Sequence, residues 1–155
     1  MPSATVQSVT RALAQAGATG EVRELAETAR TAALAASALG VEVGAIANSL
    51  VFRAGDEPVL VLTSGAHRVD VATVAGLLEL PGLTMADAAF VRRHTGQAIG
   101  GIAPLGHPRP LRTIVDVALC RYDVVWAAAG SSHTVFATSY DELLRLTAGT
   151  AAEVG

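Results

Sequence analysis

The sequence contains no lysine, because all eleven of its basic side chains are arginine. This absence excludes a lysine that forms a Schiff base, a P-loop lysine and a lysine general base. Cys120 is the single cysteine, which excludes an internal disulfide and a zinc site built from cysteines. Only 16% of the residues are charged and 51% are hydrophobic, a balance that excludes an intrinsically disordered protein. The net charge of −3 argues against broad electrostatic binding of nucleic acid, although it permits a local basic patch.

Long uninterrupted apolar runs are also missing. The two most apolar stretches, residues 31–51 and 115–129, contain charged or strongly polar side chains, and residues 1–20 lack the apolar block of a signal peptide. We therefore expect a cytoplasmic protein that does not contact membranes. The four histidines do not follow one another at the short spacings of metal ligands, so we expect no metal site.

The length and the periodicity predict one α+β domain. A chain of 155 residues buries about two-thirds of its unfolded surface, enough for a single core. We expect one domain over residues 1–155, with an N-terminal helix within residues 1–20 and a loose tail at residues 150–155. Helical and strand patterns are interspersed without regular β-α-β alternation. The expected helices cover residues 6–16, 21–39, 71–80, 85–95 and a segment after Ser139, and the expected strands cover residues 46–52, 59–63, 113–120, 124–129 and 134–138.

A segment rich in glycine and proline runs from Gly96 to Gly106. Its glycines permit backbone N–H groups to approach a ligand closely, and Pro104 restricts the backbone. Such a loop can hold an oxyanion or a hydroxyl group through main-chain donors. It can also be a plain connection between a helix and a strand. The glycine pattern of dinucleotide-binding proteins and the P-loop pattern are both absent.

Three polar residues stand at the ends or in the middle of expected strands. His133 can orient a substrate or act as a base, or it can be a solvated loop residue. His67 leaves the same two interpretations open. Asp116 interrupts an apolar run: a buried carboxylate there needs donors and marks a site, whereas an outward-pointing carboxylate fits the strand alternation equally well.

Taken in order, several segments resemble the YbaK/EbsC and ProX family of aminoacyl-tRNA editing domains, which also occurs as an insertion in bacterial prolyl-tRNA synthetases. The resemblance covers roughly residues 26–154, and the pattern Gly100-x-x-x-Pro104 matches the substrate-binding loop of the family. The segments that carry the resemblance are residues 38–41, 46–52, 59–65, 100–106, 128–130 and 140–143.

The resemblance implies an α+β fold with a mixed, barrel-like sheet flanked by helices. It implies hydrolysis of the ester that joins a wrong amino acid to the 3′-terminal adenosine of tRNA, without a metal or an organic cofactor. The expected partner is the acceptor 3′ end of a mischarged tRNA, and an aminoacyl-tRNA synthetase is a second expected partner. On this basis the expected catalytic residues are Asn48, Gly100, Gly101 and His133, and the expected substrate-binding residues are Ser49, Ile102, Ala103, Pro104, Asp116, Gly130 and Ser131.

The chain departs from the family pattern at one position. The family carries a lysine on the strand where this sequence has Asn48, and because lysine is absent no shift of alignment restores it. Asparagine can donate a hydrogen bond to a carbonyl or phosphate oxygen, but it brings neither a charge nor a titratable group. The leading hypothesis is a trans-acting deacylase of the prolyl-tRNA editing type. The alternatives are a non-catalytic module that binds aminoacyl-tRNA, a nucleotide or a synthetase, and a hydrolase of another small ester or amide.

Overall fold

A computed structural model describes residues 3–155, which form five α-helices around a mixed sheet. The helices are α1 (Ala4–Gln15), α2 (Ala32–Leu39), α3 (Val71–Leu77), α4 (Ala88–Thr95) and α5 (Tyr140–Thr147), with two 3₁₀ turns, η1 (Val43–Ala45) and η2 (Val117–Arg121). The strands are β1 (Val22–Glu24), β2 (Ile46–Ala54), β3 (Glu57–Ser64), β4 (Thr84–Met85), β5 (Arg112–Asp116), β6 (Val125–Ala128), β7 (Thr134–Thr138) and β8 (Thr150–Ala152).

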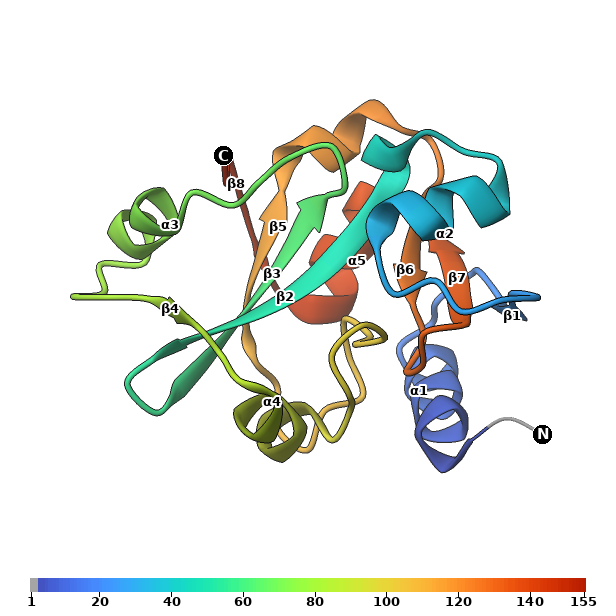
Figure 1. The fold of residues 1–155 in the computed structure, drawn as a ribbon, viewed down its shortest axis with the longest axis horizontal. Helices are drawn as coiled ribbons and strands as arrows, with labels where there is room; N and C mark the ends of the chain where they lie inside the picture. The colour runs from blue at the N-terminus through green and yellow to red at the C-terminus, as the bar shows by residue number, and fades with distance from the viewer. Residues whose placement is uncertain (1–2) are drawn as a thin grey trace.

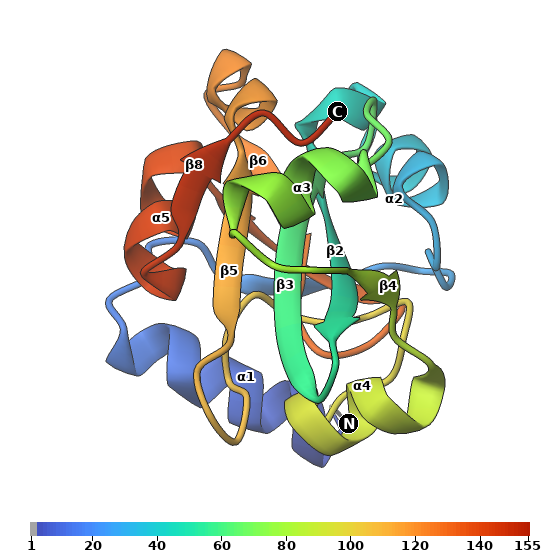
Figure 2. The same ribbon diagram turned by 90° about the vertical axis from the view of Figure 1, so that its left-hand side faces the viewer.

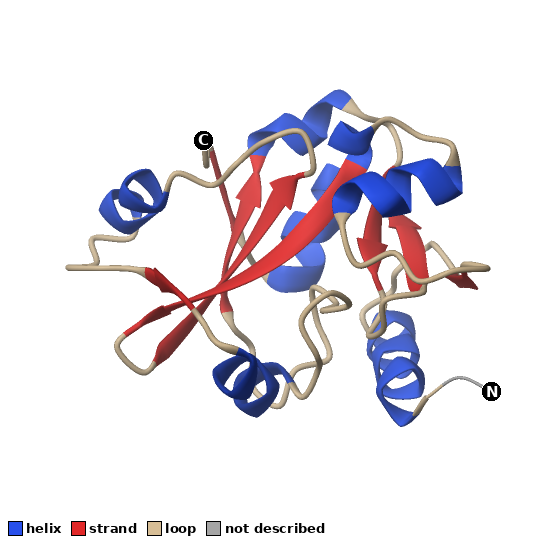
Figure 3. Ribbon diagram, in the orientation of Figure 1, coloured by secondary structure: helices blue, strands red, loops and turns tan. Residues whose placement is uncertain are grey.

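The strands lie across the sheet in the order β1-β7-β6-β2-β3-β5-β8, and β4 pairs with β2 beside this path (Figure 1). The pairs β2–β6, β3–β5 and β5–β8 are parallel, and the other ladders are antiparallel. Within residues 3–155, β1 and β8 form the two open ends of this hydrogen-bonded path. The predicted α+β class, with a mixed sheet flanked by helices, is confirmed (Figure 3).

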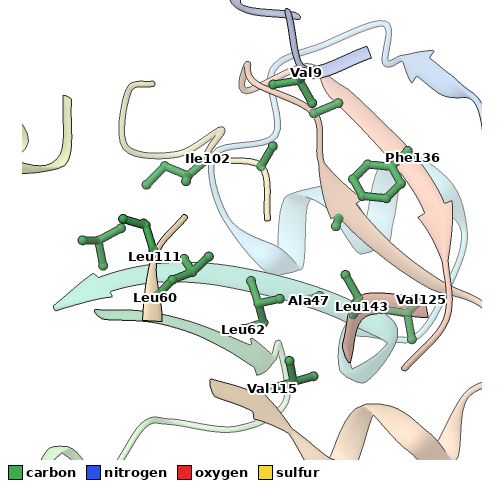
Figure 4. Packing of buried hydrophobic residues seen from close by; sticks show 14 of the residues in the cluster. Val9, Ala47, Leu60, Leu62, Ile102, Leu111, Val115, Val125, Phe136 and Leu143 are labelled. Carbon is green, nitrogen blue, oxygen red and sulfur yellow. The ribbon is translucent and has the colours of Figure 1, made fainter. Parts of the chain in front are cut away.

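The main hydrophobic core lies on one face of the long hairpin formed by β2 and β3. Leu60 and Leu62 of β3 point to the same face because side chains alternate along a strand. They belong to one cluster with Val9 of α1, Phe90 of α4 and Leu143 of α5, all nearly or completely buried. Figure 4 shows several members of this cluster, which draws on residues far apart in the sequence. These contacts fix the positions of three helices relative to the hairpin.

The opposite face of the hairpin is covered by α3, which lies across β2, β3 and β5 (Figure 2). Val59 and Val61 of β3 pack there in a second cluster with Phe52 and with Val74 of α3. A third, smaller cluster joins Ile46 at the start of β2 to α2. Because α2 contributes alanines to that contact, it lies close to the beginning of β2.

Side-chain caps determine where the helices begin. In each helix an oxygen of the capping side chain accepts a hydrogen bond from the amide three residues later, an interaction worth about 1 kcal/mol. The helices α2 and α4 end at glycines in the left-handed conformation, Gly40 (φ 68°) and Gly96 (φ 72°), as the sequence predicts. The capping residues are Ser3, Thr31, Asp70, Asp87 and Ser139.

The helix predicted over residues 21–39 is wrong over its first half. Residues 22–24 form β1, which pairs with β7, and α2 begins only after its cap, Thr31. The cause is a tertiary contact. A side chain at Gly20 would overlap the backbone of Ala137 in β7, so only glycine lets the chain come this close to the sheet. Pairing with β7 then favours a strand over the local helix propensity.

Three further boundaries differ from the prediction. Met85 belongs to β4, and Asp87 caps α4 two residues beyond the predicted helix start. The strand predicted over residues 113–120 stops at Asp116, whose side chain accepts from the amide of Ala118 and starts η2 instead. The tail predicted to be loose forms β8, which pairs with β5, and Val154 is fully buried behind α3.

Candidate functional site

A cavity of about 230 Å³ opens beside β2, close to where β6 and α2 meet it. Its walls come from β2, β6, the segment that leads into α2, the turn between β6 and β7, and the segment of residues 96–106, called the glycine loop from here on. Ligand pockets for drug-sized molecules usually measure about 300–1,000 Å³. The cavity therefore has room for a small group such as an aminoacyl moiety, with the remainder of a larger ligand lying outside.

A gap in the sheet creates this cavity. On the edge of β2 that faces away from β3, β6 pairs only with Ile46 and Ala47, and β4 pairs only with Phe52 and Arg53. Between these two ladders, residues 48–50 have no strand beside them among residues 3–155. An uncovered strand edge exposes backbone donors and acceptors as well as side chains, so it can hold a ligand.

Asn48 and Ser49 stand in this gap and line the cavity together. The Oγ atom of Ser49 is buried and makes no hydrogen bond within residues 3–155. The half-buried side chain of Asn48 likewise makes no hydrogen bond within the described chain. Buried polar atoms are normally satisfied, so an unpaired hydroxyl on a residue that lines a cavity marks Ser49 as a candidate ligand-binding residue. The structure thus brings these two predicted residues together.

The glycine loop forms the opposite wall and is docked onto the turn between β6 and β7. Gly100 has a φ of 98°, a conformation that favours glycine. A side chain at Gly101 would overlap the backbone of Ser131, so the two segments touch through their main chains. The amide of Gly130 donates to the carbonyl of Gly101 at 2.9 Å, which fixes this contact. Gly100, Gly101 and Ser131 line the cavity, whereas Gly130 lies behind it against α1.

Only part of the loop has free backbone donors. The amide of Ala103 donates to a glutamine side chain at 2.6 Å, the amide of Gly101 donates within the loop at 3.3 Å, and Pro104 has no N–H. The amides of Gly100 and Ile102 make no hydrogen bond among the described residues. Gly100 and Ile102 both line the cavity, as does Ile99, whose amide is likewise unpaired among the described residues, so these three amides are the loop donors available to a ligand.

Ile102, Ala103 and Pro104 anchor the loop to the protein interior. Ile102 belongs both to the cavity lining and to the main core cluster, which Figure 4 shows. Ala103 is fully buried and Pro104 is buried, and neither lines the cavity. The structure therefore places these two predicted binding residues behind the wall, where they hold it in position.

Two residues that the sequence did not single out, Gln97 and His107, hold this loop in place through hydrogen bonds to Ala103. Gln97 is 2% exposed, and its Oε1 accepts the amide of Ala103. The Nε2 of His107 donates to the carbonyl of Ala103 at 2.8 Å. Burial lowers the pKa of His107 below its ordinary value, and the hydrogen bond to Ala103 opposes that change. The position of Gln97 directly after the helix-ending glycine was the available signal in the sequence.

His133 does not reach the cavity. Its side chain is exposed and is not part of the lining. Its backbone carbonyl instead accepts from the amide of Leu25 at 2.7 Å, which ties the turn between β6 and β7 to the chain after β1. The neighbouring Ser131 lines the cavity, and its Oγ is hydrogen-bonded to Thr134 Oγ1 at 2.8 Å.

Asp116 lies outside the cavity and is 1% exposed. Its carboxylate accepts from the amide of Ser64 at 3.0 Å and from the amide of Ala118 at 2.9 Å. The hydroxyl of Thr63 and Nδ1 of His67 lie 3.3 Å and 3.0 Å from the same oxygen, Oδ2. The carboxylate thus joins the ends of β3 and β5 to η2 and to the loop after β3. The sequence left its direction open, and the structure shows that it points inward with a complete set of donors.

Arg30 and Trp126 also line the cavity, and sequence reasoning missed both. Arg30 immediately precedes Thr31, the cap of α2, and its side chain packs against Gly100. Trp126 is half-buried in β6, with the guanidinium of Arg23 6.0 Å from the centre of its ring. The only signal for Arg30 was its place directly before a helix cap.

Residues 3–155 offer neither a metal-binding cluster nor a membrane-spanning helix. That part of the chain contains no group of three or more histidine, cysteine, aspartate or glutamate side chains arranged to hold a metal ion. None of its helices is long and apolar enough to cross a membrane.

Comparison with known families and structures agrees with this geometry. The profile of the aminoacyl-tRNA editing domain matches residues 26–146. A solved structure, described as that of a candidate trans-editing enzyme for prolyl-tRNA synthetase, superimposes with a TM-score of 0.93 at 39% identity, covering 99% of this chain and 98% of the other.

Two curated proteins are similar in sequence. The Bacillus subtilis protein YwhH is 29% identical over 140 residues, which span 90% of this chain and 88% of YwhH. The proline–tRNA ligase of Leuconostoc mesenteroides is 34% identical over 71 residues, 46% of this chain. Those residues make up 12% of the ligase, so the similarity concerns one segment of that much longer protein.

Proposed function

Because the chain belongs to the aminoacyl-tRNA editing domain family, we propose that it is a trans-acting deacylase that hydrolyses the ester of mischarged tRNA, of the prolyl-tRNA editing type. The observation that carries this proposal is the small cavity in which an uncovered edge of β2 faces the free amides of the glycine loop. Its size suits an aminoacyl group, and its two walls offer hydrogen-bond donors to an ester held between them.

In this proposal the residues of β2 bind the substrate, and the residues of the glycine loop stabilise charge. Asn48 and Ser49 hold the substrate end from β2, and the amides of Gly100 and Ile102 stabilise the negative charge that develops on the carbonyl oxygen. One donor of this kind contributes about 10²–10³ in rate in other enzymes. These donors are held in place before the substrate arrives, because the loop is anchored in the core by Ile102.

Water is the nucleophile in this mechanism. It adds to the carbonyl carbon, the bond between that carbon and the ribose oxygen breaks, and the products are the free amino acid and the ribose hydroxyl. The described lining of the cavity includes no histidine and no carboxylate. The proton that water loses therefore passes through the substrate itself or through solvent to the ribose oxygen.

The same lack of an acid or base in the described lining supports a second candidate function. A pocket that offers hydrogen-bond donors but no acid or base can bind an aminoacyl-adenosine end, or a synthetase segment, without hydrolysing anything. The two candidate functions predict different turnover but the same binding, so an experiment must measure turnover as well as binding.

The test is deacylation of a panel of mischarged tRNAs by the purified chain, beginning with Cys-, Ala- and Ser-tRNA(Pro). A deacylase releases amino acid from at least one of them faster than the tRNA does alone. Binding of a non-hydrolysable aminoacyl-adenosine analogue without turnover on any tRNA supports the binding module. Absence of both turnover and binding refutes both candidates.

A further inference from the structure

We propose that Arg30 is the phosphate-binding residue of this site and holds the phosphodiester that precedes the terminal nucleoside of the ligand. This inference rests on the proposed function, because it requires a ligand that ends in a nucleotide. It adds a positioning residue and a direction of binding: the acyl group enters the cavity, and the phosphate stays at its mouth beside Arg30.

Charge is the first argument. Arg30 is the one residue with a formal charge among those described as lining the cavity, and every other lining residue is neutral. Its guanidinium is exposed and makes neither an ion pair nor a hydrogen bond within residues 3–155. An unpaired arginine at the rim of a neutral cavity presents five donors with no acceptor supplied by the described chain.

The second argument is the rigidity of the segment that carries this side chain. On one side, the amide of Ala29 donates to the carbonyl of Ser132 at 2.5 Å. On the other side, Thr31 caps α2 by accepting from the amide of Leu34 at 3.2 Å. A Cβ atom at Gly100 would lie 3.7 Å from the Cβ and 3.6 Å from the Cγ of Arg30, which is ordinary van der Waals contact. The base of the side chain is therefore fixed against the glycine loop, while its charged end is free.

The chemistry of the ligand provides the third argument. An aminoacyl ester of a terminal adenosine carries an ammonium group and a neutral ester, and its nearest anion is the phosphodiester on the 5′ side of that nucleoside. A guanidinium binds a phosphate in a bidentate manner and repels an ammonium group. Arg30 thus favours the orientation in which the amino acid lies away from it, among the neutral lining residues that include Asn48 and Ser49. Asn48 itself brings no charge, so among the described lining residues Arg30 carries the positive charge of the site.

The experiment compares two non-hydrolysable probes with the full-length chain. One is a 3′-aminoacylamino analogue of adenosine, which has no phosphate, and the other is the same analogue at the end of a CCA trinucleotide. The variants are Arg30→Ala, Arg30→Lys and, as a matched loss of one positive charge elsewhere, Arg121→Ala. Arg121 is exposed and lines a different hollow, beside Asp116. Melting temperatures of all variants are measured first, and we expect them to match, since both arginines are exposed.

We expect Arg30→Ala to weaken binding of the trinucleotide probe by about tenfold or more and to leave binding of the adenosine probe unchanged. We expect Arg30→Lys to restore part of the loss and Arg121→Ala to have no effect. The slope of log affinity against log salt for the trinucleotide becomes shallower by roughly 0.7 in Arg30→Ala, the value for one phosphate on a single strand.

If Arg30→Ala loses the same affinity for both probes, or loses affinity for neither, Arg30 does not bind the phosphate and the proposal is overturned. If the wild-type chain binds the two probes equally tightly, the phosphate is not recognised and this inference fails, while the proposed function stands on turnover of the tRNA panel. If the wild-type chain binds neither probe and hydrolyses no tRNA, both proposals fail.

Discussion

At the scale of single residues, the site is made of side chains that lack partners, and the framework is made of side chains that have all of theirs. Asn48 and Ser49 belong to the first group. Asp116 belongs to the second, because two amides, a hydroxyl and an imidazole surround its carboxylate. The sequence placed all three among the candidate site residues, and residue type alone did not separate them.

The role of Asp116 is tested by its removal. Asp116→Ala leaves the amides of Ser64 and Ala118 without acceptors in the protein interior, so we expect it to lower the free energy of unfolding by about 3 kcal/mol. The matched control is Asp56→Ala, which breaks an exposed ion pair with Arg53 and costs less than about 0.5 kcal/mol. Urea denaturation measures both. Equal effects of the two substitutions would show that Asp116 does not join the strand ends.

The residues that sequence reasoning found and missed differ in a physical way. Asn48 and the pattern from Gly100 to Pro104 were named as candidates because they lie in segments that resemble a family in order and spacing. Arg30 and Gln97 were missed because their roles depend on contacts across the fold. Arg30 meets Gly100 only when α2 docks beside the loop, and the buried environment of Gln97 does not follow from its neighbours.

At the scale of elements, the glycine loop decides the shape of the cavity. Gly101 is the tightest point of the loop, because a Cβ at this position would overlap the backbone of Ser131. We expect Gly101→Ala to displace the loop, to destabilise the protein by about 1–3 kcal/mol and to reduce turnover. Thermal denaturation and deacylation rates measure the two effects.

Gly76→Ala is the control for that substitution. Gly76 lies in α3, and a Cβ there meets no atom within 4 Å. We expect Gly76→Ala to stabilise the protein by about 0.5–1 kcal/mol and to leave turnover unchanged. If Gly101→Ala behaves like Gly76→Ala, the contact between the loop and the turn is not tight.

His107, which holds the glycine loop, makes the stability of the protein depend on pH. The pKa of His107 in the folded protein is below its ordinary value of 6.5, because burial disfavours the charged imidazole. Between that lowered pKa and 6.5 the unfolded chain binds a proton that the folded protein does not, so stability falls as the pH falls below 6.5. His107→Gln, whose amide can still donate to Ala103, should lack this component of the fall. Denaturant midpoints from pH 7.5 to 5 measure it, and parallel curves for the two proteins would contradict this account.

Some elements of the fold can be predicted from the local sequence, and others cannot. The hairpin of β2 and β3 and the ends of α2 and α4 before Gly40 and Gly96 follow from neighbouring residues, and the sequence predicted them. The strand β1 was missed because its pairing with β7 joins residues more than a hundred positions apart. The end of β5 was missed because Asp116 caps η2 through a side chain whose direction depends on the fold.

At the scale of the whole molecule, the C-terminal residues complete the sheet and the second core. Val154 is 0% exposed and packs with α3, and β8 covers the outer edge of β5. We expect Val154→Ala to lower the free energy of unfolding by about 2 kcal/mol, because it leaves a cavity. Val124→Ala is the matched control at 48% exposure, with an expected effect below about 0.5 kcal/mol. Chemical denaturation compares them, and similar costs would show that the C-terminal segment is not held in the core.

The whole molecule presents a small cavity, with Arg30 as its charged lining residue among those described, between an open strand edge and an anchored loop, in a chain of the aminoacyl-tRNA editing family. The central claim is that this cavity hydrolyses an aminoacyl ester although its Asn48 brings neither a charge nor a titratable group. The most direct measurement is single-turnover hydrolysis of mischarged tRNA(Pro) by the wild-type chain, Asn48→Ala and His133→Ala. We predict wild-type hydrolysis above the spontaneous rate, a fall of about a hundredfold in Asn48→Ala and a much smaller fall in His133→Ala, whose side chain lies outside the cavity. A wild-type rate equal to the spontaneous rate, or an Asn48→Ala rate equal to the wild-type rate, would contradict the account.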